Sequence, residues 1–152
     1  MFLFYERRGA RRGRDTSLMP SVVSLIRSPS LATAPYAFAA TAPANARLIF
    51  LAGACPLDES GATVGEGDVA AQARQVMANA ITALADSGAS VSDVIYSRLS
   101  VATTSRDDLT VAWNIGRAAF GDHDVPSTLV GVTVLGDPYQ LVELELVAAI
   151  VD

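Results

Sequence analysis

The sequence predicts an α+β domain in which a mixed β-sheet carries two helices packed on one of its faces. Two observations support this fold class. Runs of β-branched and aliphatic residues bounded by Pro, Gly or Ser are typical of strands. Between them lie two stretches with apolar residues at three- and four-residue spacing, typical of amphipathic helices. The resulting order is β-β-β-α-β-α-β-β, and two such helices can cover only one face of a sheet.

The strand predictions rest on aliphatic runs at residues 22–26, 47–54, 94–102, 126–132 and 141–151. The last two runs are joined through Gly136-Asp137-Pro138, a turn sequence that favours a hairpin. In the last run Glu143 and Glu145 alternate with aliphatic residues, so the strand period puts both carboxylates on one face. In the run at 94–102, Arg98 and Ser100 share a face in the same way.

The helix predictions rest on caps and periodicity. Asp68 stands where an N-cap would, ahead of an apolar stripe that stops near Ser87-Gly88. The second helix begins after Ser105, which forms a weak capping box with Asp108, and it ends at Gly121. The stripe of this second helix consists of Leu109, Ala112, Trp113 and Phe120.

Length, composition and charge limit the possible functions. The chain has 152 residues, 51% of them hydrophobic, which fits one compact domain at residues 19–152. Residues 1–18 carry five arginines against Glu6 and Asp15, a charge of +3, and the total of −5 leaves −8 for the rest. We expect residues 1–18 to be a disordered leader or upstream translated sequence, and we expect no binding of nucleic acid by the folded part.

Location is inferred from two further features. No apolar run reaches the length of a membrane span, so we expect no membrane association. Cys55 is the single cysteine and has no internal disulfide partner, which makes a reducing cytoplasm the expected compartment. A buried, inert thiol is its simplest interpretation. His123 lies between two aspartates, which is too few ligands for a metal site, so we expect no metal.

Four segments together resemble the RidA/YjgF family of reactive imine and enamine deaminases, also described as L-PSP ribonucleases. Residues 34–36 look like the family's Gly-Pro-Tyr, with Tyr36 kept. Residues 51–56 look like its Ser-Gly-Gln-x-Pro, with Gly53 kept and alanine at Ala52 and Ala54. Residues 70–77 resemble its helix signature, and the two last runs resemble its closing strands. The resemblance covers roughly residues 22–151.

This resemblance implies a homotrimer of chorismate-mutase-like subunits, with clefts for a small-molecule ligand between subunits and without a cofactor. It aligns Glu143 with the family's glutamate that handles the hydrolytic water. Tyr36 is then a pocket residue, and Ala52 and Gly53 line the same cleft. Ser127 takes the position of the arginine that holds a substrate carboxylate, a contact that serine cannot replace. Arg98 is a candidate replacement cation.

Two functions remain open. The first is hydrolytic deamination of small enamines or imines, or a related hydrolysis, with an altered substrate. The second is a non-catalytic trimer that binds a small metabolite. The alanines at Ala52 and Ala54 suggest a less polar or carboxylate-free ligand. Simpler interpretations also stand: Glu143 and Arg98 as solvated strand residues, Tyr36 as a packing aromatic and Ser127 as a strand-start hydroxyl.

Overall fold

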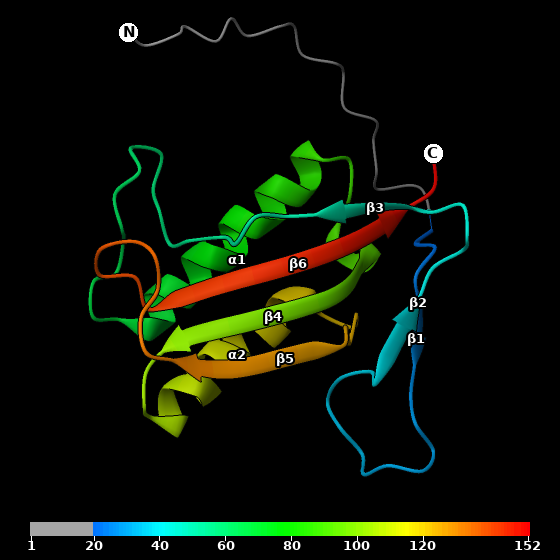
Figure 1. Ribbon diagram of the computed structural model, residues 1–152, viewed down its shortest axis with the longest axis horizontal. Helices are drawn as coiled ribbons and strands as arrows, with labels where there is room; N and C mark the ends of the chain where they lie inside the picture. The colour runs from blue at the N-terminus through cyan, green and yellow to red at the C-terminus, as the bar shows by residue number, and fades with distance from the viewer. Residues whose placement is uncertain (1–19) are drawn as a thin grey trace, which may run out of the picture.

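The computed structural model describes residues 20–152, so the leader expected at 1–18 lies outside the described residues. In chain order the elements are β1 (Ser24–Ile26), β2 (Ala39–Thr41), β3 (Arg47–Phe50), α1 (Val69–Asp86), the short 3-10 helix η2 (Val91–Asp93), β4 (Val94–Ala102), α2 (Arg106–Phe120), β5 (Ser127–Val132) and β6 (Val142–Ile150) (Figure 1). The predicted order is confirmed, with η2 added. β2 is only three residues of Ala and Thr and carries no strand pattern of its own.

A four-stranded mixed sheet has the order β3-β6-β4-β5, and β1 and β2 form a separate antiparallel ribbon. The hairpin predicted between β5 and β6 is wrong, because β4 lies between these strands (Figure 1). β5 instead runs parallel to β4, a pairing that needs the long crossover supplied by α2. The segment after β5 then passes the end of β4, where Leu141 O accepts a hydrogen bond from Ala102 N at 2.8 Å.

The register of β4 against β6 confirms the predicted two-faced pattern of both strands. Three pairs put side chains on the helix side of the sheet: Val101 with Val142, Leu99 with Leu144, and Ser97 with Leu146. The pairs between them, Ser100 with Glu143 and Arg98 with Glu145, face the opposite side. We call this side the uncovered face, because both helices pack on the other one (Figure 1).

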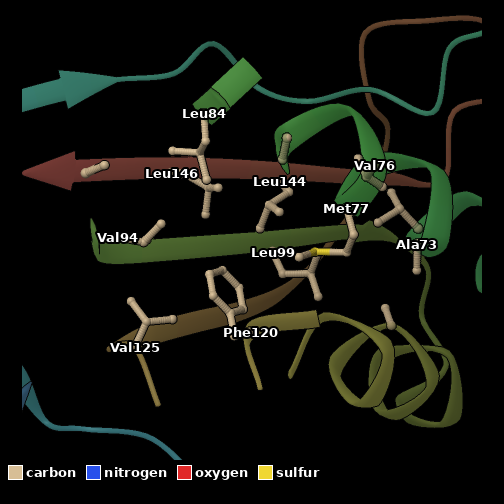
Figure 2. Packing of buried hydrophobic residues seen from close by; sticks show 14 of the residues in the cluster. Ala73, Val76, Met77, Leu84, Val94, Leu99, Phe120, Val125, Leu144 and Leu146 are labelled. Carbon is tan, nitrogen blue, oxygen red and sulfur yellow. The ribbon is translucent and has the colours of Figure 1, made fainter. Parts of the chain in front are cut away.

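The hydrophobic core fills the space between the sheet and the two helices (Figure 2). Val76 and Leu84 of α1 are at most 1% exposed and belong to the same buried cluster as Val94 and Leu146 of the sheet, which are at most 2% exposed. Burial of one such aliphatic side chain contributes roughly 1.5–3 kcal/mol to folding. The core therefore holds the helices against one face and leaves the other face free for function.

The helix caps agree with the prediction for α1 and differ for α2. Asp68 Oδ1 accepts a hydrogen bond from Ala71 N at 2.9 Å, so the predicted N-cap is confirmed. Ser105 makes no capping bond with its side chain, so the predicted capping box is wrong. The Asp108 carboxylate instead accepts a hydrogen bond from Thr103 Oγ1 at 2.6 Å, a nearer competing donor.

Candidate functional site

Glu143 lies near the start of β6 on the uncovered face, beside Ser100 of β4, and is half-buried. Its Oε2 accepts a hydrogen bond from Gln140 Nε2 at 3.1 Å. Gln140 is 4% exposed, and the same Nε2 also donates to Val142 O at 3.2 Å. The carboxylate is therefore held by a buried amide that is itself fixed to the backbone.

A kink in the chain after β3 brings Gly53 against this carboxylate. The strand predicted over 47–54 ends at Phe50. Leu51 N still donates to Leu146 O at 3.1 Å, and the chain then pairs with β6 again at a bridge between Ala54 and Leu144. A Cβ on Gly53 would lie 2.7 Å from Glu143 Cδ, too close for any side chain. Glycine at position 53 is thus a condition for the position of Glu143, and the neighbouring Ala52 is exposed at the same rim.

Gln72 of α1 fixes the loop that precedes Glu143. Its Nε2 donates to Tyr139 O at 2.9 Å and Gly65 O at 3.2 Å, and its Oε1 accepts from Leu141 N at 2.7 Å. Gln72 is fully buried, and Tyr139 has a φ of 61°, an unusual conformation for a residue other than glycine. The loop conformation is therefore imposed by a side chain from the helix.

Two further amides of α1 fix the chain around Cys55 in the same way. Asn79 Nδ2 donates to Cys55 O and to Leu57 O, both at 2.9 Å. Gln75 Nε2 donates to Leu57 O at 3.3 Å, whereas Arg74 is exposed. The glutamines of the helix signature therefore have a structural role: they position both loops that surround Glu143.

Burial, a hydrogen bond to Asp137 and the negative charge of Glu143 raise the pKa of the Cys55 thiol to about 11. The Cys55 Sγ lies 3.9 Å from Glu143 Oε2. At neutral pH Cys55 is a thiol, which is a poor nucleophile. The residue best placed for proton transfer in this part of the chain is Glu143.

A second group of residues lies on the helix side of the sheet, at the start of β5. Ser127 Oγ lies 2.6 Å from Ser97 Oγ and donates to Val125 O at 2.9 Å. Tyr36 packs edge-on against Trp113 of α2, with ring centroids 5.9 Å apart. Tyr36 thus has a packing contact while it borders the same space as Ser127.

That space is a narrow hollow of about 20 Å³, room for about one water molecule, between α2, the sheet and the chain at Tyr36. Its lining is mostly aromatic and aliphatic, with the hydroxyl pair of Ser97 and Ser127 among the polar members. His123 lines it from the loop after α2, and its Nε2 lies 2.7 Å from Val94 O. Within residues 20–152 no three His, Cys, Asp or Glu side chains converge to hold a metal ion. We call this hollow the α2 pocket.

The model of the family described as Endoribonuclease L-PSP matches residues 27–150. The chain belongs to this L-PSP family. Family membership agrees with the chorismate-mutase-like α+β fold described above, two helices on a mixed sheet. A comparison with curated proteins finds no match.

Solved structures extend the similarity. YyfB from Yersinia pestis, a protein of unknown function of the conserved Rid family, is 27% identical; 85% of this chain and 99% of that one align with a TM-score of 0.77. A YjgF-family member from Mycobacterium tuberculosis is 28% identical over 84% and 99% of the chains, with a TM-score of 0.58. RidA from an Antarctic Psychrobacter species shares the fold, at 22% identity over 86% and 100% and a TM-score of 0.60.

The L-PSP fold divides the predicted site residues of one chain into two groups. Glu143 and Gly53 come together, whereas Tyr36 and Ser127 line the α2 pocket. β5 and β6 start at opposite ends of the sheet, and Ser127 and Glu143 lie on opposite faces of it (Figure 1). Arg98 projects from the uncovered face, away from Ser127.

Three further polar or aromatic residues at these two places are not among the family motifs quoted above. Gln140 bonds Glu143, and Trp113 and Arg117 line the α2 pocket. Trp113 and Arg117 are four residues apart on α2, a spacing that places both on one helix face. The spacing of Trp113 and Arg117 can be read from the sequence. The role of Gln140 cannot, because it depends on the turn of the loop before β6. No helix of the described part is long and apolar enough to cross a membrane.

Proposed function

We propose that this L-PSP family protein hydrolyses small reactive imines or enamines, or performs a related small-molecule hydrolysis, with Glu143 as the catalytic carboxylate. The observation that carries the proposal is the immobilised Glu143 side chain, held by Gln140 and given room by Gly53. Ser127 in place of the family's arginine gives the protein an altered substrate.

The chemistry requires one group that shuttles a proton twice, first during the addition of water and then during the loss of ammonia. Water adds to the carbon of the C=N bond while a carboxylate takes its proton. The protonated carboxyl returns this proton to the imine nitrogen, which gives the neutral carbinolamine. The carboxylate then takes the hydroxyl proton of the carbinolamine and passes it to the nitrogen as the C–N bond breaks, so that ammonia leaves and a carbonyl remains. Glu143 is half-buried and faces away from the core, which allows contact with both water and a bound substrate.

The proposal includes a closed trimer, in which Glu143, Gly53 and Ala52 of one subunit meet Tyr36 and Ser127 of the next. Two observations support an assembly. The two groups lie at separate places in one chain. The uncovered face also carries apolar residues, with Phe50 73% exposed and paired with Val147. We therefore expect Phe50→Glu to lower the molar mass in light scattering to that of a monomer.

The deciding experiment measures ammonia release from imines that an amino-acid oxidase generates in situ from several amino acids. We expect turnover by the wild type and a loss of at least about 100-fold in Glu143→Ala, the usual contribution of a general acid–base group. Glu145→Ala is the matched control, since Glu145 is exposed on the same face of β6. Equal losses in both variants would refute a specific role of Glu143.

The contacts of Ser127 and its lack of charge favour a second function. Its hydroxyl lies against Ser97 and the backbone, and it offers no charge to a substrate. The alternative is a trimer that binds a small metabolite without converting it. Activity absent in the wild type and gained in Ser127→Arg would support this alternative, because orientation of the substrate supplies much of the rate.

A further inference from the structure

Ser100 of β4 is a residue on the uncovered face that the mechanism above does not use. It stands directly opposite Glu143 in the antiparallel pairing of β4 with β6, so both side chains project from the same face. Residues that face each other in this way have Cβ atoms about 4.5–5.5 Å apart. One water molecule can therefore bridge the Ser100 hydroxyl and the Glu143 carboxylate.

The Ser100 hydroxyl has no hydrogen-bond partner within residues 20–152, although the residue is only 7% exposed. Ser97 on the other face of the same strand is bonded: its Oγ lies 2.6 Å from Ser127 Oγ. Every fully enclosed side-chain N or O atom of the described residues has a partner, so the Ser100 Oγ is one that solvent still reaches. Buried polar groups almost always bond protein or ordered water, and the partner of Ser100 therefore comes from outside the chain.

Glu143 uses only one of its two carboxylate oxygens for contacts with the rest of the described chain. Its Oε2 accepts the hydrogen bond from Gln140 Nε2 at 3.1 Å and lies 3.9 Å from Cys55 Sγ. Its Oε1 accepts no hydrogen bond from residues 20–152 and is the Glu143 atom nearest to the place that a Cβ of Gly53 would take. Because glycine leaves that place empty, Oε1 is the oxygen that is available to accept a proton.

We propose that Ser100 Oγ and Glu143 Oε1 together hold the water molecule that attacks the substrate. This inference deepens the proposed function and rests on it, since it names the two atoms that place the hydrolytic water. The water donates one hydrogen to Oε1 and the other to Ser100 Oγ, and both acceptors belong to the sheet. A lone pair of the water oxygen is then directed away from the sheet, toward a substrate on the uncovered face.

The proton balance of the reaction is unchanged by Ser100. As the bond forms between the water oxygen and the carbon of the C=N group, the proton on the Glu143 side passes to Oε1. The other hydrogen stays on the new hydroxyl group, and Ser100 keeps its own proton throughout. Ser100 therefore contributes orientation of the attacking oxygen, which supplies much of the rate in reactions of this kind.

A purely structural role of Ser100 predicts different kinetics. A structural defect would lower the melting temperature and disturb the site as a whole. Loss of a contact to the attacking water, by contrast, lowers kcat and kcat/KM together and leaves KM nearly unchanged. Ser100→Ala should not unfold the protein, because it removes a hydroxyl without leaving a protein group unpaired.

The first measurement is ammonia release by the full chain, with the same imines generated in situ. We expect Ser100→Ala to lower kcat about tenfold, the value of one hydrogen bond, at a KM close to that of the wild type. Thr82→Ala is the matched control, because Thr82 is an exposed hydroxyl residue of α1 that bonds only Ala78 O, at 3.0 Å. Its kcat should equal that of the wild type, and thermal melts verify that both variants are folded.

The second measurement is independent of turnover: crystal structures of the wild type and of Ser100→Ala. We expect an ordered water within hydrogen-bond distance of Ser100 Oγ and Glu143 Oε1 in the wild type, and its loss or displacement in the variant. A residue of a neighbouring subunit bonded to Ser100 Oγ in place of water would overturn the proposal.

The kinetic results separate this inference from the proposed function. Ammonia release that is lost in Glu143→Ala but unchanged in Ser100→Ala would overturn the role of Ser100 alone. A raised KM at unchanged kcat would do the same, because it would assign Ser100 to substrate binding. Absent release by the wild type would refute the deaminase proposal, and the crystal structures would still decide whether Ser100 and Glu143 share a water.

Discussion

Gly53 lies so close to the Glu143 carboxylate that a methyl group on it would stand 2.7 Å from Glu143 Cδ. The two residues come from different parts of the chain, the kink after β3 and the start of β6. Neither can change its backbone position freely, because Ala54 N donates to Leu144 O at 2.8 Å beside them. A side chain at position 53 must therefore displace Glu143.

We expect Gly53→Ala to lower the free energy of unfolding by about 1 kcal/mol, because the displaced Glu143 carboxylate loses its hydrogen bond from Gln140. Gly116→Ala is the matched control: its nearest neighbours, Leu99 Cδ2 and Met77 Sδ, lie at 3.7 and 4.0 Å. Alanine is favoured over glycine within a helix by about 1 kcal/mol, so this variant should be at least as stable as the wild type. Urea unfolding of both variants measures the difference, and a Gly53→Ala protein of unchanged stability would contradict the expectation.

Gln72→Ala should destabilise the protein by about 2–4 kcal/mol, because it leaves two carbonyls and one backbone N–H without their partner. Gln75→Ala serves for comparison, since Gln75 is only half-buried and bonds one backbone carbonyl, Leu57 O. Denaturant unfolding and amide exchange at Leu141 measure the effect. A loss no larger than that of Gln75→Ala would show that the loop before β6 holds its shape unaided.

The two helix starts allow a paired test of capping. Asp68→Ala removes an observed side-chain bond to Ala71 N and should cost about 1 kcal/mol. Ser105→Ala removes a side chain without a capping bond and should cost close to nothing. Melting temperatures of the two variants, compared with the wild type, check both statements, and similar losses would contradict the assignment.

Cys55 predicts a pH dependence. Its pKa is raised from 9.0 to about 11, first by burial, so the folded protein retains the thiol proton more strongly than the unfolded chain does. The resulting stabilisation is fully present below pH 9 and declines as the pH rises toward 11. Native alkylation by iodoacetamide should accordingly be slow at pH 8 and accelerate above pH 10.

Cys55→Ser separates this effect from the general loss of stability in alkali. It should lessen the decline in the free energy of unfolding between pH 9 and 11, while stability below pH 9 changes little with pH in both proteins. Alkylation of unfolded protein in urea gives the reference rate. Equal rates for folded and unfolded protein at pH 8 would show that the thiol is not protected.

Local periodicity explains why much of the fold was predictable. The alternation of Glu143 and Glu145 with core residues appears in the structure as two faces of β6. The aspartate cap of α1 was equally visible, because capping depends on residues near in sequence. The order of strands in the sheet was not predictable in this way. Gly136-Asp137-Pro138 has the composition of a hairpin turn, yet the strand beside β5 is β4, which lies earlier in the chain and not next to β5 in sequence.

The site was predictable only as a set of residues. The motif comparison indicated Gly53 and Glu143 separately, and the structure places them in contact. Ser127 was placed with Glu143 by the same motifs, although one chain holds them on opposite faces of its sheet. Gln140 could not be identified, because its amide reaches Glu143 through a loop whose shape Gln72 imposes from the helix.

The sheet order also governs when the domain can form during synthesis. β6, the last element, occupies an interior position between β3 and β4. Until β6 leaves the ribosome, β3 has no partner in its sheet, and only β4, α2 and β5 can assemble as a parallel unit. The nascent chain therefore exposes the facing edges of β3 and β4 until β6 is available, and a deletion of residues 143–152 removes most of the strand that joins the sheet.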